Sequence, residues 1–73
     1  MLTLKLMNRR AGRTTTVECG SVSVDWKNGE AKIVVTTVDG EKMFKVARGG
    51  EYDVGYVENY RGATTQTIRA EGP

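Results

Sequence analysis

Few side chains in this 73-residue sequence could carry out chemistry, and none of them forms a catalytic or metal-binding motif. The chain has no histidine and one cysteine, Cys19, which excludes an internal disulfide, a Cys/His zinc site and a Cys–His nucleophile. Glu51 and Asp53 share one face of a predicted strand, but two carboxylates at this spacing are a weak cation site. No glycine-rich phosphate-binding loop occurs. We therefore expect a protein that is not an enzyme and that uses neither a metal nor a cofactor.

Arginine is the side chain whose placement suggests a function. Arg9, Arg10 and Arg13 lie within one predicted loop, Asn8–Arg13, and Lys5 precedes it. These residues give the chain a charge of +4 before its first acidic residue, whereas the remainder carries −2. A guanidinium group can bind phosphate or carboxylate through two parallel hydrogen bonds. The sequence predicts a basic contact surface here, and the alternative is a solvated loop that aids solubility.

Three tyrosines recur every four residues, at Tyr52, Tyr56 and Tyr60, a spacing that keeps them on one face of a strand. We expect Tyr52 and Tyr56 to fill the core, and Tyr60 to be exposed beside Arg61 in a turn. Tyrosine and arginine are enriched among the residues that dominate binding energy at interfaces. Tyr60 and Arg61 therefore belong to the predicted partner-binding surface, where an aromatic and basic pair could also stack single-stranded bases.

The elements that position these side chains are predicted to be strands. Val, Thr and Ile make up 20 of the 73 residues, and β-branched side chains favour strands over helices. Nine glycines interrupt the chain, and no window has the apolar spacing of a helix. The longest purely aliphatic run is Ile33–Val35, so no membrane-spanning helix is expected. Strands are predicted at 2–7, 14–18, 21–26, 51–58 and 63–69, with two more on either side of 39–40.

Two short turns fix the register of a predicted three-stranded meander. Asn28-Gly29 and Asp39-Gly40 both suit the type I′ turn, whose two central residues need positive φ. As two-residue loops, the first pairs Val24 with Ile33 and the second pairs Ile33 with Val46. Both registers place the same apolar side chains on one face, which is the predicted core: Val22, Val24, Trp26, Ile33, Val35, Phe44 and Val46.

The next turn, Arg48–Gly50, is predicted to be a three-residue hairpin loop with a glycine in the left-handed conformation. That loop length pairs Phe44 with Val54, which keeps the apolar face intact. Phe44→Ala is then expected to cost about 3–5 kcal/mol, comparable with the whole stability of so small a domain.

The predicted fold class is all-β: a small antiparallel meander of roughly 5–7 short strands in a bent sheet, barrel-like or a compact sandwich. The alternative is a smaller sheet with the N-terminal segment partly unstructured. Residues 1–70 are predicted to form a single small β domain, and residues 71–73 a flexible tail.

A small β-core, the basic stretch Arg9-Arg10-Ala11-Gly12-Arg13 and the lack of a catalytic group together resemble small bacteriophage-encoded regulators that bind the host RNA polymerase. The resemblance implies a regulatory protein that binds host machinery stoichiometrically and alters transcription initiation or termination, without a cofactor. It also implies action in the cytoplasm of a bacterial host. A single cysteine and the lack of a signal peptide's apolar stretch agree with that location.

Three other functions stay open: a small β-barrel that binds nucleic acid, an inhibitor of another host system, and a phage structural protein. Direct nucleic-acid binding is opposed by the modest net charge of +2, because nonspecific affinity comes from neutralising phosphates. We expect a protein partner and no membrane contact. The basic loop could also touch nucleic acid that passes the partner.

Overall fold

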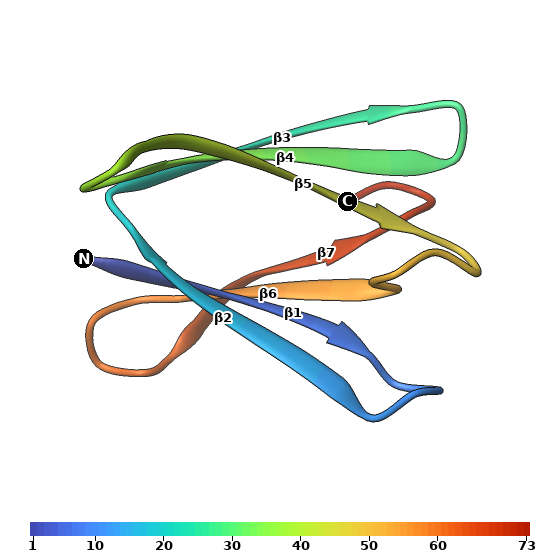
Figure 1. Ribbon diagram of the computed structural model, residues 1–73, viewed down its shortest axis with the longest axis horizontal. Helices are drawn as coiled ribbons and strands as arrows, with labels where there is room; N and C mark the ends of the chain where they lie inside the picture. The colour runs from blue at the N-terminus through green and yellow to red at the C-terminus, as the bar shows by residue number, and fades with distance from the viewer.

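The structure is a computed structural model that describes all residues, 1–73, and it consists of seven strands with no helix (Figure 1). The strands are β1 (Leu2–Asn8), β2 (Arg13–Cys19), β3 (Ser21–Lys27), β4 (Glu30–Thr37), β5 (Gly40–Ala47), β6 (Val54–Glu58) and β7 (Thr64–Arg69). The prediction of an all-β fold is confirmed. No helical segment that could cross a membrane is present.

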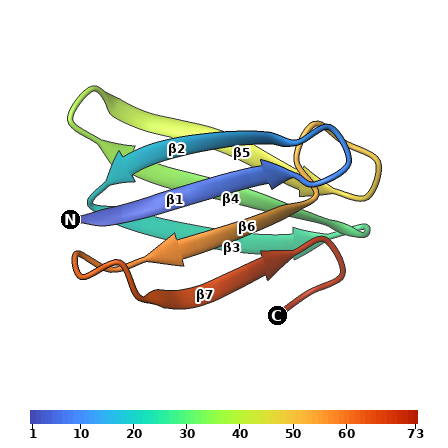
Figure 2. The same cartoon turned by 90° about the horizontal axis from the view of Figure 1, so that it is seen from below.

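The strands form two antiparallel sheets that stack as the two layers of a sandwich (Figures 1 and 2). One sheet has the strand order β2-β1-β6-β7, and the other has the order β3-β4-β5. Neither sheet closes into a barrel. Of the predicted arrangements, the structure shows the compact sandwich. The chain passes between the layers at Gly20, whose amide donates to the Thr36 carbonyl (2.8 Å), and again through residues 48–53.

The first predicted turn is confirmed. Asn28 and Gly29 both have positive φ, 55° and 76°, as a type I′ turn requires. Their two-residue loop pairs Val24 with Ile33 in the predicted register. Asparagine tolerates the left-handed region, and Asn28 is the one non-glycine residue of the chain that adopts it.

The second turn differs from the prediction. The loop consists of Val38 and Asp39, and Gly40 begins β5 with a φ of 108°. The Thr37 hydroxyl holds this arrangement, since it accepts from the Asp39 amide (3.1 Å) and donates to the Gly40 carbonyl (2.8 Å). A left-handed glycine directly after a tight turn is a common way to close a hairpin.

The register that follows from this turn corrects the predicted one by two residues. Ile33 pairs with Phe44 rather than with Val46. A shift of two keeps every side chain on its predicted face, so the apolar face is preserved. Ile33 and Val35 are fully buried as predicted, whereas Trp26 and Phe44 are only partly buried.

The hairpin predicted around Arg48–Gly50 is wrong. Gly49 has the predicted positive φ, 75°, but the chain then leaves the sheet of β5 and enters the other sheet. Val54 pairs with Met7 of β1 instead of Phe44. The physical reason is that pairing with β6 gives β1 a neighbour on both sides, β2 and β6, and joins the β1–β2 and β6–β7 hairpins into one four-stranded sheet.

The core lies between the two layers. Eleven buried residues form one cluster: Leu4, Leu6, Cys19, Ala31, Ile33, Val35, Val46, Tyr52, Val57, Ile68 and Ala70. Gly55 of β6 makes room for it, because a Cβ there would meet Leu6 Cδ2 at 3.3 Å and Ile68 Cβ at 3.5 Å. At the rim, the Trp26 indole N–H donates to the Arg69 carbonyl (2.7 Å), which ties the three-stranded sheet to β7.

Candidate functional site

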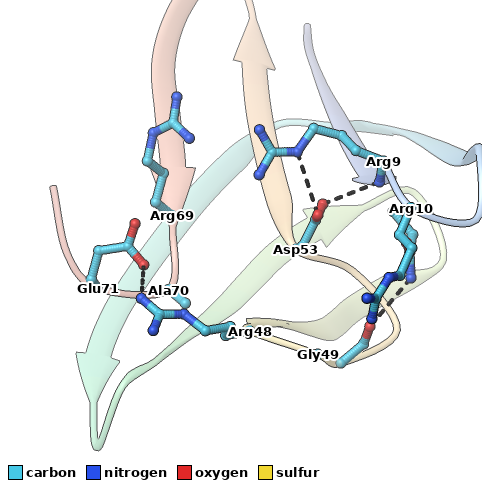
Figure 3. A pocket seen from close by; sticks show the side chains of 10 residues that line it. Arg9, Arg10, Arg48, Gly49, Asp53, Arg69, Ala70 and Glu71 are labelled. Carbon is cyan, nitrogen blue, oxygen red and sulfur yellow. Dashed lines mark hydrogen bonds and ion pairs between the residues drawn. The ribbon is translucent and has the colours of Figure 1, made fainter.

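Arginines from three separate chain segments gather at one end of the sandwich, around a hollow of about 330 Å³ (Figure 3). The segments are the loop after β1, the loop after β5, and the end of β7. Six charged residues line the hollow, and we call this cluster the arginine end: Arg9, Arg10, Arg48, Arg69, Asp53 and Glu71.

Hydrogen bonds hold the loop after β1 against the loop after β5. The Asn8 side-chain nitrogen donates to the Glu51 carbonyl at 2.9 Å and to the Gly50 carbonyl at 3.3 Å. The Asn8 side-chain oxygen accepts from the Ala11 amide at 2.9 Å, which closes the turn of the basic loop. The two loops therefore present their arginines as one surface.

Two arginines of the arginine end are paired with its acidic residues. The Arg9 backbone amide and Nε both donate to the Asp53 carboxylate, each at 3.3 Å, and the Asp53 side chain is 25% exposed. Arg48 Nη2 lies 3.8 Å from Glu71 Oε2, with both side chains extending into solvent. Pairs as exposed as the second contribute little to stability, so Arg48 can exchange Glu71 for another anion at little cost.

Arg10 and Arg69 have no carboxylate within 4.0 Å. The four arginines and two acidic residues of the arginine end sum to +2, and the uncompensated charge lies on these two guanidinium groups. A guanidinium without an internal partner offers all its N–H donors to an external carboxylate or phosphate.

The other predicted basic residues, Lys5 and Arg13, lie outside the hollow. Lys5 is in the middle of β1, where its Nζ is 3.2 Å from Glu58 Oε2. Arg13 begins β2, and its Nη1 is 3.8 Å from Glu51 Oε2. The Arg13 pair is as long as that of Arg48 with Glu71, so it is its position outside the hollow that separates Arg13 from the arginine end. Glu51 and Asp53, the two carboxylates considered as cation ligands, each have an arginine as their partner.

Tyr60 and Arg61 lie at the opposite end of the sandwich, in the loop between β6 and β7 (Figure 1). Tyr60 is 77% exposed. The Arg61 guanidinium carbon is 5.3 Å from the centre of the Tyr60 ring, and Arg61 Nε donates to the Tyr60 hydroxyl at 2.9 Å. The structure therefore does not bring these two residues to Arg9 and Arg10, and no aromatic residue lines the hollow of the arginine end.

Sequence reasoning missed Arg48 and Arg69 as site residues. Strand direction is the signal that could have found them, because the strands of this chain alternate in direction along the sequence. Loops after odd-numbered strands then lie at one end, and loops after even-numbered strands at the other. Because of this alternation, Arg48 and the end of β7 lie at the same end of the sandwich as the basic loop, and Tyr60 lies at the opposite end.

Comparisons with known protein families, with curated proteins and with solved structures found no match to this chain. The fold and the charges therefore carry the functional argument. They define a small two-layer β-sandwich whose loops present an arginine-rich end.

Proposed function

We propose that this protein is a non-enzymatic binding protein whose arginine end docks on an acidic surface of a protein partner. The observation that carries the proposal is the convergence of four arginines from three chain segments around one hollow. Arg10 and Arg69 supply guanidinium groups with no internal partner, and arginine pairs with carboxylates through two hydrogen bonds. Arg9 and Arg48 belong to the same cluster, where Asp53 and Glu71 partly compensate their charges.

The composition of the arginine end favours a protein partner over a nucleic acid. Asp53 and Glu71 lie among the arginines and would repel a continuous row of phosphates. Binding to single strands without sequence preference also relies on aromatic side chains that stack on bases, and the exposed aromatic residue Tyr60 is at the other end. A cluster with a charge of +2 and two carboxylates among its arginines instead suits a protein surface that is acidic overall and carries some basic groups.

The proposal names bacterial RNA polymerase as the partner to test first. The support is the resemblance of the basic loop and small β-core to phage-encoded regulators of that enzyme. The protein would then act in the cytoplasm of the bacterial host, and would alter transcription initiation or termination by occupying a surface of the polymerase.

The test compares R10E/R69E with R61E in binding to purified bacterial RNA polymerase. Both variants change exposed side chains, and R61E is the control for position because Arg61 lies at the far end. The single variants R10E and R69E match R61E in charge, since each of the three lowers the net charge by two. We expect R10E/R69E to associate about tenfold or more slowly at low salt, since steering by charge raises association rates by this order. R61E should keep the wild-type rate.

Circular dichroism first establishes that both variants are folded. Wild-type affinity in a folded R10E/R69E would contradict the arginine end as the interface. A wild-type protein that ignores the polymerase but binds single-stranded oligonucleotides would replace the proposal with nucleic-acid binding. Binding lost in R61E alone would place the interface at Tyr60 and Arg61.

A further inference from the structure

Strand β5 has an edge whose backbone groups have no partner strand. It is the outer strand of the sheet β3-β4-β5. The two-residue turn at Asn28-Gly29 makes Lys27 and Glu30 a hydrogen-bonded pair, and such pairs alternate along an antiparallel ladder. Residues of β4 bond alternately to β3 and to β5, so Ile33, which does not bond to β3, forms a hydrogen-bonded pair with Phe44 of β5. The residues on either side of Phe44 therefore direct their amides and carbonyls outward, away from β4.

A bond at the end of the strand confirms this alternation. Ala47 belongs to the outward series, and its amide donates away from β4, to the Tyr52 carbonyl at 3.0 Å. The remaining outward residues are Glu41, Met43 and Lys45. Their amides and carbonyls form a short open template for another strand.

Met43 is an unusual residue for an open edge. Its side chain is 69% exposed, and of the exposed large apolar side chains it is the one that lies within a strand. Natural proteins generally protect sheet edges with charges or irregularities, and an apolar residue in the middle of an open edge favours pairing. The other edge strands, β2, β3 and β7, expose no large apolar side chain.

We propose that two copies of this chain pair through their β5 edges, antiparallel, about a two-fold axis at Met43. The two three-stranded sheets then become one continuous sheet of six strands. In this register Met43 faces the partner's Met43, and Glu41 faces the partner's Lys45. The three outward positions of each strand exchange about six backbone hydrogen bonds.

Charge selects this register among those that the hydrogen bonds allow. Outward residues must face outward residues, so the alternatives are shifts by an even number of residues. A shift in either direction removes both pairings of Glu41 with Lys45. The chosen register also places Lys42 across from the partner's Phe44, where an ammonium group can approach an aromatic ring. Lys45 keeps its ion pair with Glu30, at 3.6 Å, on the same face.

The surroundings of the edge leave room for a second copy. A hollow of about 380 Å³ lies beside β5 and is lined in part by Phe44, Ala47 and Tyr52. The partner's Gly40 would lie across from Val46, next to this hollow, and glycine brings no side chain into it. The paired stretch then ends at Val46, so Ala47 keeps its hydrogen bond to the Tyr52 carbonyl.

The dimer places the two arginine ends far apart. The arginine end follows the C-terminus of β5, and the two β5 strands run in opposite directions. None of Glu41, Met43 and Lys45 lines the arginine end, so pairing is independent of the proposed function. Both arginine ends stay open, and the dimer can bind two acidic sites at once.

The test is the mass of the full chain in solution, measured by sedimentation from about micromolar to millimolar concentration. The wild type should reach twice its monomer mass of 8.0 kDa. E41K and K45E should each dissociate about tenfold more readily, because like charges then face each other. Mixed together, E41K and K45E should pair again, since every lysine then faces a glutamate. The double variant E41K/K45E should recover the dimer alone.

A second measurement traps the predicted contact. M43C should cross-link to its partner under oxidising conditions, because directly opposed hydrogen-bonded residues have Cα atoms about 5.5 Å apart. E18C, on the edge strand β2 of the other sheet, is the matched control and should not cross-link. A wild type that stays monomeric at millimolar concentration would overturn the proposal. So would a dimer that E41K and K45E both leave intact.

Discussion

Cys19 is a single residue whose environment decides its chemistry. It is 1% exposed and belongs to the buried cluster between the sheets. Burial raises the pKa of the Cys19 thiol above its ordinary value of 9.0, although the N-terminal amino group acts in the opposite direction. A buried thiol with a raised pKa forms little thiolate, which is the reactive form, so Cys19 serves as a core side chain.

Cys19 should contribute to a loss of stability at alkaline pH. Because its folded pKa is raised, its contribution to the free energy of unfolding is fully present below the unfolded pKa, and is lost as the pH rises through the folded pKa. Urea unfolding of the wild type and of C19A from about pH 7 to pH 10 measures this contribution. The wild type should lose more stability than C19A, and parallel curves would contradict the argument.

Leu6 should be more important for stability than Phe44. Leu6 is 0% exposed at the centre of the core, so Leu6→Ala should cost about 2–5 kcal/mol and leave much of the protein unfolded. Phe44 is only partly buried, so the cost of Phe44→Ala falls to about 1–2 kcal/mol, below the sequence-based expectation. Urea unfolding of both variants in dilute solution gives the order, and a larger loss in Phe44→Ala would reverse it.

The difference between these expectations shows what the alternation of apolar residues can predict. The alternation correctly identified the face that carries Trp26, Ile33, Val35 and Phe44. It could not give their depth, because depth depends on strand order. Ile33 and Val35 lie on β4, the central strand of its sheet, whereas Trp26 and Phe44 lie on the edge strands β3 and β5 and reach the rim.

Among the elements, the turn after β3 depends on a glycine with positive φ. Gly29 has a φ of 76°, so Gly29→Ala forces a side chain into the left-handed region at a cost of about 1–2 kcal/mol. Gly20→Ala is the matched control, because a Cβ at Gly20 would contact Thr36 Oγ1 at an ordinary 3.5 Å. Thermal unfolding should show a lower midpoint for Gly29→Ala than for Gly20→Ala. Equal midpoints would contradict the turn geometry.

The turns also separate what local sequence determines from what it does not. The turn at Asn28-Gly29 sets the register of β3 with β4 through the conformations of its own two residues. The next turn was decided by the Thr37 hydroxyl, which holds Asp39 and Gly40 and moves the loop by one residue. The direction that the chain takes after Gly49 is not determined by local sequence, because it depends on the pairing of β6 with β1, far away in the sequence.

At the scale of the whole molecule, the two ends of the sandwich have different charges and side chains. The sequence predicted the basic loop, of which Arg9 and Arg10 lie in the arginine end. Arg48 and Arg69 join them only because three segments fold together, and no local pattern contains that information. Tyr60 and Arg61 were assigned to the same surface because sequence reasoning did not follow the direction of β6, which runs antiparallel to β1.

The central place of β1 determines how this chain can fold. The pairs β1 with β2, β3 with β4, β4 with β5, and β6 with β7 join neighbouring segments, whereas β1 with β6 joins Leu4 to Val57. Closing that long loop carries the largest entropic cost of any pairing in the molecule, and nonlocal pairings slow folding. During synthesis β1 is made before β6, so the four-stranded sheet can be completed only after residues 54–58 have left the ribosome.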